Sequence, residues 1–117
     1  MEINIKSTKK TAKSLISSKP VYSTLHCIEV TNANILDYNQ FQKLFSTNGW
    51  GTSEWEETMM ENDVHCFFQV RNVTGNSFDM EVEDFDGMKI DFGDESGDMC
   101  AFIKYYLNKN NLKYIEL

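Results

Sequence analysis

The 117-residue sequence has one proline, six glycines and three cysteines, and it contains no long hydrophobic run. Because about 18 consecutive apolar residues are needed to cross a bilayer as a helix, no membrane-spanning segment is expected. The first residues also lack the apolar core that follows the charges of a signal peptide. We therefore expect a single globular domain over residues 1–117, located in the cytoplasm.

The three cysteines, Cys27, Cys66 and Cys100, are an odd number, lie far apart and form no C-x-x-C motif. A small secreted domain normally carries a dense and even set of cysteines that form disulfides. The pattern therefore favours free thiols, buried as small apolar side chains in a reducing compartment.

The sequence contains no phosphate-binding loop, nucleophile elbow, zinc-protease helix or dinucleotide-binding glycine motif. Counting back from each glycine of the acidic segment places an apolar residue at the first ligand position of an EF-hand, so no calcium loop is predicted. We expect no cofactor, no metal site and no enzymatic activity.

Two His-Cys dipeptides, His26-Cys27 and His65-Cys66, contain the side-chain types that bind zinc. Adjacent side chains of a strand point to opposite faces, so each dipeptide offers only one residue to a common site. We expect the cysteines in the core and the histidines on the wetter face. The alternatives are a surface metal site shared with Glu83, or a small enzyme that uses His26 and His65 as acid and base.

Apolar spacing and capping residues predict three helices, over residues 35–46, 54–62 and 98–109. The second helix has the spacing of a capping box, because Ser53 stands three residues before Glu56.

Segments rich in β-branched and aromatic residues predict strands near 21–30 and 112–117. A short strand is expected over 2–6, followed by a loop or surface helix over 7–19. Residues 64–92 alternate apolar and polar side chains and predict a three-stranded antiparallel meander. The fold class is therefore α+β, with the helices packed on the apolar face of an antiparallel sheet.

The register of the meander follows from keeping its apolar residues on one face. A loop over residues 85–87 pairs Val82 with Ile90. Keeping the apolar residues on one face also pairs Val70 of the first strand with Phe78 of the middle strand. Asp79, Glu81 and Glu83 are then expected on the opposite, solvent-facing side of the middle strand.

The net charge of −7 is unevenly distributed. Residues 1–20 contain five lysines and one acid, whereas residues 79–98 contain nine acids and one lysine. The negative electrostatic field of such an acidic segment repels nucleic acid and attracts basic partners. The residues predicted to bind a partner are the acids Asp79, Glu81, Glu83, Asp84, Asp86, Asp91, Asp94 and Glu95.

The two tryptophans, Trp50 and Trp55, flank a glycine-containing loop before the second helix. A tryptophan in such a place usually anchors the core. If Trp50 is exposed beside the acids, it becomes a candidate contact for a partner.

In its size, acidity and α+β pattern, with the acidic segment Phe78–Asp98, the chain resembles small cytosolic immunity proteins of bacterial contact-dependent inhibition and related polymorphic toxin systems. The resemblance implies a non-catalytic inhibitor that binds and neutralises a basic toxin, such as a nuclease, through its acidic surface. The alternative is a phage-encoded inhibitor, or a DNA mimic, that acts on a host nucleic-acid-binding defence protein.

Overall fold

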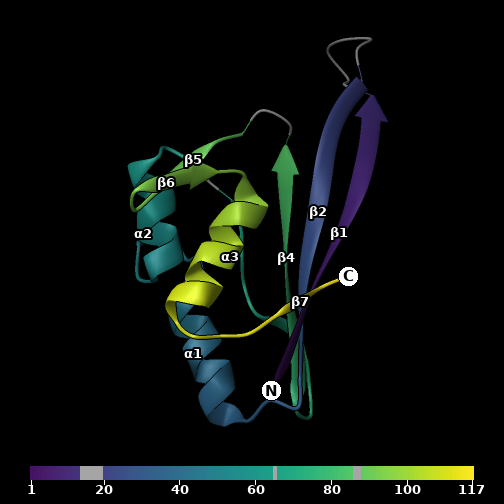
Figure 1. Ribbon diagram of the computed structural model, residues 1–117, viewed down its shortest axis with the longest axis vertical. Helices are drawn as coiled ribbons and strands as arrows, with labels where there is room; N and C mark the ends of the chain where they lie inside the picture. The colour runs from purple at the N-terminus through teal and green to yellow at the C-terminus, as the bar shows by residue number, and fades with distance from the viewer. Residues whose placement is uncertain (14–19, 65, 86–87) are drawn as a thin grey trace.

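The computed structural model describes residues 1–13, 20–64, 66–85 and 88–117 and has an α+β fold. A five-stranded mixed sheet has the order β3-β4-β2-β1-β7, and β5 and β6 form a separate two-stranded sheet (Figure 1). The strands are β1 (Glu2–Lys13), β2 (Pro20–Thr31), β3 (Arg71–Thr74), β4 (Ser77–Phe85), β5 (Ile90–Phe92), β6 (Glu95–Gly97) and β7 (Ile115–Glu116). The helices are α1 (Ile35–Phe45), α2 (Glu54–Glu61) and α3 (Met99–Lys109).

The large sheet is built around β2, which pairs antiparallel with both β1 and β4. His26 is the Cα partner of Ser7 on β1 and of Val82 on β4. On the far side of β1, the short strand β7 runs parallel and pairs only with Asn4 and Ile5.

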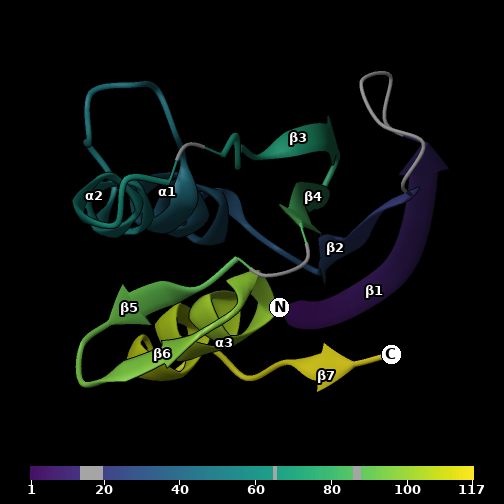
Figure 2. The ribbon, with the colours of Figure 1, turned by 90° about the horizontal axis from the view of Figure 1, so that it is seen from above.

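The helices and the β5–β6 hairpin lie on one side of the large sheet (Figure 2). We call the sheet face beneath them the inner face; it buries apolar side chains such as Ile5, Ile28 and Met80. The opposite side, the outer face, carries the alternate residues of the same strands. This division follows directly from the period of two along a strand.

Aromatic rings fill the space between the helices and the inner face. Trp55 is fully buried and stacks on Phe102 with a centroid separation of 4.0 Å. Phe45 packs edge-on against Phe68 and against Trp55. None of the helices in the described ranges is long and apolar enough to cross a membrane.

All three predicted helices are confirmed to within one residue at each end. Asn34 caps α1 in a reciprocal capping box with Asp37, and Asp98 caps α3 by accepting the N–H of Ala101. The sequence leaves Asn32 or Asn34 open as the cap of the first helix and Ser96 or Asp98 as the cap of the last, and the structure uses Asn34 and Asp98.

The predicted meander over 64–92 is wrong in its strand pairing. Met80 pairs with Ile28 of β2, and Ile90 pairs with Gly97 of β6, so the expected pairing of Val82 with Ile90 does not form. The apolar face of β4 fits that of β2, which is distant in sequence. A turn at Gly93 and Asp94 instead folds residues 90–97 back on themselves.

The segment before β3 keeps its predicted alternation but is not a strand in the described residues. Phe68 is fully buried, whereas Phe67 is 79% exposed. The backbone N–H of Phe68 donates to Thr47 Oγ1, so this segment bonds to the loop after α1. Pairing with β4 begins only at Arg71, which lies opposite Asp79, and the predicted Val70–Phe78 pair is absent from this part of the structure.

The N-terminal prediction was too short and the C-terminal one too long. β1 extends to Lys13, through residues expected to form a loop or helix, and residues 14–19 lie outside the described part of the chain. Thr8, Lys9, Lys10 and Thr11 are exposed in this part of β1, so hydrophobicity did not reveal the strand. At the C-terminus, only Ile115 and Glu116 form a strand.

Candidate protein-binding surface

The predicted carboxylate row lies on the outer face of β4. Burial alternates along β4, with Phe78, Met80 and Val82 buried between the more exposed acids. Asp79 and Glu81 are partly exposed and Glu83 is exposed. The Oε1 atom of Glu83 accepts a hydrogen bond of 2.7 Å from Ser23 of the neighbouring strand.

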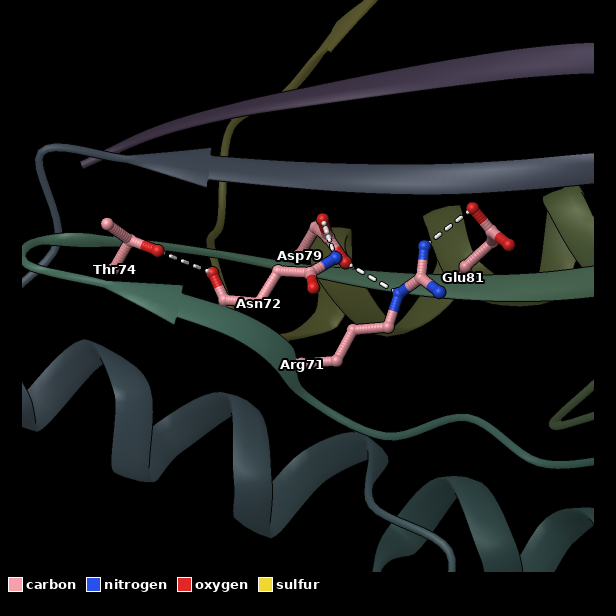
Figure 3. A network of polar contacts seen from close by, with 5 residues as sticks. All are labelled: Arg71, Asn72, Thr74, Asp79 and Glu81. Atoms are coloured by element: carbon pink, nitrogen blue, oxygen red, sulfur yellow. Dashed lines mark hydrogen bonds and ion pairs between the residues drawn. The ribbon is translucent and has the colours of Figure 1, made fainter.

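Arg71 of β3 bridges two members of this row (Figure 3). Its Nε donates to Asp79 Oδ1 over 2.8 Å, and its Nη2 donates to Glu81 Oε2 over 2.7 Å. Asn72 donates to the other carboxylate oxygen of Asp79 over 2.9 Å. Burial alone would lower the pKa of Arg71, but the bond to Asp79 and the charges of both carboxylates raise it. Asp79 and Glu81 therefore help to hold the edge strand β3 on β4.

Asp84 does not belong to the outer-face row, which corrects the sequence-based assignment. It stands two and four positions after Val82 and Met80, so it lies with them on the inner face, where it is buried. Burial raises the pKa of the Asp84 carboxyl, and the nearby charge of Asp98 raises it further. Hydrogen bonds from His26 and from the backbone of Met99 act in the opposite direction. This carboxylate is therefore not part of the exposed acidic surface.

Asp84 ends a polar chain of three side chains on three strands. Ser7 Oγ lies 2.7 Å from His26 Nδ1, and His26 Nε2 lies 3.4 Å from Asp84 Oδ2. His26 is buried, whereas Ser7 is exposed. In the tautomer that donates from Nε2 to Asp84, His26 Nδ1 accepts a hydrogen bond from the Ser7 hydroxyl.

The expected facing of the first His-Cys dipeptide is reversed. His26 lies on the inner face, because its register partners are Ser7 and Val82, and Cys27 lies on the outer face. The hydrogen bonds of His26 to Ser7 and Asp84 offset the cost of burying its polar ring. His65, the other member of the proposed histidine pair, lies outside the described residues.

The three cysteines are half-buried free thiols, less buried than the sequence analysis expected. Burial raises the pKa of each thiol above its ordinary value, and the charges of Asp79 and Asp84 raise those of Cys27 and Cys66 further. Neutral thiols are poor nucleophiles. No group of three or more histidine, cysteine or acidic side chains suited to a metal ion occurs in the described part of the chain.

The remaining predicted acids lie on the β5–β6 hairpin, away from β4. Asp91, Asp94 and Glu95 are exposed. Asp86 lies outside the described residues. Asn62, at the end of α2, bonds the backbone of Asp91 through both its amide oxygen and its amide nitrogen.

The structure therefore places the hairpin acids next to α2, and the sequence analysis did not single out the exposed acids of that helix. Glu57 and Glu61 are exposed on α2, which contains no basic residue. We call the surface formed by Glu57, Glu61, Asp91, Asp94 and Glu95 the acidic edge.

Trp50 is 84% exposed, whereas Trp55 is fully buried, so the two tryptophans have separate roles. Next to the Trp50 loop lies a pocket of about 300 Å³, which Gly49, Met60, Val64 and Phe67 help to line. Phe67 is also largely exposed. Trp50 is thus exposed, as its role as a candidate partner contact requires, and the nearest feature of the surface is this pocket.

A buried carboxylate fixes the shape of the Trp50 loop. Glu56 accepts the backbone N–H groups of Asn48, Gly49 and Gly51 at 2.7 to 2.9 Å. Burial alone would raise the pKa of Glu56, but the backbone donors together lower it. Ser53 caps α2 as predicted, but Glu56 binds this loop instead of completing the capping box. The sequence spacing does not reveal this second use of Glu56.

Comparisons with known proteins give no relatives for this chain. No family model, no curated protein and no solved structure matches it.

Proposed function

We propose that this chain is a non-catalytic inhibitor of the immunity-protein type, which binds and neutralises a basic protein, such as a nuclease toxin, in the cytoplasm. The carboxylates of the acidic edge form the attracting surface. A partner that must hold phosphates is itself basic, so its cleft is complementary to such a surface.

The observation that carries the proposal is a set of exposed carboxylates that pair with no basic side chain in the described residues. In the described ranges, Asp91, Asp94 and Glu95 form no ion pair with lysine or arginine, unlike Asp79 and Glu81. Like charges close together cost stability, and these three side chains make no hydrogen bond or ion pair within the described part of the chain. An attractive field for a basic partner gives these acids a purpose beyond solubility.

The placement of the acids also favours a compact docking surface over DNA mimicry. A mimic needs carboxylates at phosphate-like spacing over a long surface. Here Asp79 and Glu81 are bridged by Arg71, and Asp84 is buried on the other face. The exposed lysines Lys6 and Lys10 of β1 also oppose a continuous negative array.

The test begins with a pull-down from the native host, followed by association kinetics with the purified partner at low and high salt. Reversing Asp91, Asp94 and Glu95 to lysine should slow association about tenfold or more and weaken its salt dependence, because rim charges act mainly on the association rate. The fold should be retained, since these side chains are exposed.

A charge-matched control separates local placement from net charge. Reversing Lys6, Lys9 and Lys10 to glutamate in the same variant restores the net charge of −7, because six charge units are added and six are removed. The control should remain slow. If it associates as fast as the parent, only the overall charge matters and the acids of the hairpin are a solvated surface.

A second candidate function, a small hydrolytic enzyme, is favoured by the Ser7–His26–Asp84 chain. A serine hydroxyl that bonds a histidine, which in turn bonds a carboxylate, is the arrangement that activates a nucleophile. Ser7 is exposed, so an ester could reach its hydroxyl. The same three residues also connect β1, β2 and β4, which is a sufficient structural reason for their contacts.

Labelling with a fluorophosphonate decides between these roles. An activated serine should be labelled at position 7, and the label should be lost in Ser7→Ala. Labelling of other serines at the same rate, or of none, would leave the polar chain as a structural link between the strands.

A further inference from the structure

The loop before α2 holds Trp50 away from the core in a fixed conformation. Gly49 and Gly51, on either side of it, have φ angles of 85° and 70°, which glycine adopts without strain. The backbone N–H of Trp50 donates to Asn48 Oδ1 over 2.8 Å. Together with the bonds to Glu56, these contacts fix the backbone without using the indole ring. Because the backbone is already fixed, only the side chain of Trp50 has to be ordered when a partner binds.

The pocket beside this loop is mainly apolar. Met59, Met60, Val64 and Phe67 contribute side chains to it, and Gly49 forms part of its rim. Gly51 lies against Met60, because a Cβ atom at Gly51 would come within 3.1 Å of the Met60 sulfur. Trp50 thus stands between Gly49, which lines the pocket, and Gly51, which lies against the pocket residue Met60. Exposed tryptophan and phenylalanine beside a pocket are typical of the energetic centre of a protein interface.

The charge of the surroundings indicates what kind of partner fits. Glu57 and Glu61 are exposed on α2, whose residues Met59 and Met60 line the pocket. The Cγ of Glu57 is 3.7 Å from the position of a Cβ at Gly51. An apolar pocket with acids at its side is complementary to an aliphatic side chain next to an arginine. The guanidinium can stack on Trp50 while the acids attract it.

We infer that the pocket bounded by Gly49, Met60 and Phe67, together with Trp50, is the contact centre for a basic protein segment in which arginine alternates with leucine-like side chains. This inference rests on the proposed function and names the place on the surface where the partner is held. The acidic edge then acts as the surrounding rim that speeds the encounter.

The test uses the ¹⁵N-labelled chain and a defined peptide of alternating arginine and leucine. Trp50 and Trp55 give separate indole N–H signals, so the exposed and the buried ring report independently. We expect the Trp50 indole and the amides of Gly49, Gly51 and Phe67 to shift on titration. The Trp55 indole should not shift, because its ring is fully buried.

Variants then measure the contribution of the ring and of the acids. Trp50→Ser should weaken binding at least tenfold, as expected for a residue at the centre of an interface. Leu36→Ser is the matched control: Leu36 is 73% exposed on α1, and the change should leave affinity unaltered. Glu57→Lys should weaken binding at low salt more than at high salt.

Two control peptides complete the design. A peptide with aspartate in place of arginine should not bind, and one with glycine in place of leucine should bind more weakly at the pocket. Shifts confined to Glu83 and the hairpin amides would overturn the pocket inference and leave the proposed function standing. If no cationic peptide shifts any amide at millimolar concentration, both proposals fail. Equal affinity of Trp50→Ser and the parent would also overturn the inference.

Discussion

Arg71 and Asp79 lie directly opposite each other across β3 and β4, and the guanidinium Nε donates to the carboxylate over 2.8 Å. The same guanidinium reaches Glu81, two residues further along the facing strand. A side chain that bonds both its opposite and its diagonal neighbour fastens a four-residue edge strand whose own residues are all exposed.

Replacing Arg71 with alanine should lower the free energy of unfolding by about 1 kcal/mol, since two partly exposed charged hydrogen bonds are lost. Arg71→Lys keeps the charge but cannot reach both carboxylates with one planar group, so it should be intermediate. Urea denaturation of the three proteins measures the differences. An Arg71→Ala variant as stable as the parent would mean that the contacts are incidental.

Glu56 should make the stability of the fold sensitive to acid. Its pKa is lowered in the folded chain from the ordinary value of 4.5, so its contribution is present above that pH and is lost as the pH falls through the folded value. Glu56→Gln should cost about 1–3 kcal/mol near pH 7, because an amide group cannot accept all the backbone donors. The difference between variant and parent should shrink below pH 4.5 in urea titrations. A constant difference at all pH values would contradict this explanation.

Asp84 should show the opposite trend. Its pKa is raised by burial from the ordinary value of 3.8, so its favourable contribution exists below that pH and is lost as the pH rises through the folded value. Asp84→Asn should therefore gain stability relative to the parent as the pH rises. Unfolding free energies measured across this range test the sign, with His26 and Asp98 as the ionisable neighbours that couple to it.

Trp55 should be the most sensitive aromatic residue of the core. Trp55→Ala removes a fully buried ring stacked on Phe102 and should cost about 3–5 kcal/mol. Trp55→Phe should cost less, because the indole Nε1 is buried without a hydrogen-bond partner in the described part of the structure. Thermal unfolding compares the two variants. Equal losses would show that the indole ring is required as a whole.

The sequence predicted the helices well because their signals are local. Caps such as Asn34 and Asp98 act within one turn of the helices that they begin. The faces of β4 were also predictable, since alternation depends only on neighbouring residues. Applied strictly, the same alternation puts Asp84 on the inner face with Val82, and treating it as part of an exposed acidic group was the error.

Strand partners were not predictable, because pairing depends on residues far apart in the chain. His26 and Asp84 are 58 positions apart, and nothing in either segment alone indicates that they meet. The exposure of Trp50 depends similarly on Glu56, which has the spacing of a capping-box residue but binds the preceding loop. The acidic character of the candidate site could be predicted from the sequence. Its location could be identified only from the folded structure.

The short pairing of β7 has a consequence for the N-terminal strand. Within the described residues, β1 has no strand partner on that side beyond Ile5, which leaves part of a long edge open. Open edges invite further strands to add, and charged side chains along them prevent it. Lys6, Lys9 and Lys10 occupy this stretch, and a second identical edge laid alongside would bring ammonium groups together. The lysines of this acidic chain thus oppose the pairing of β1 with the same strand of a second copy.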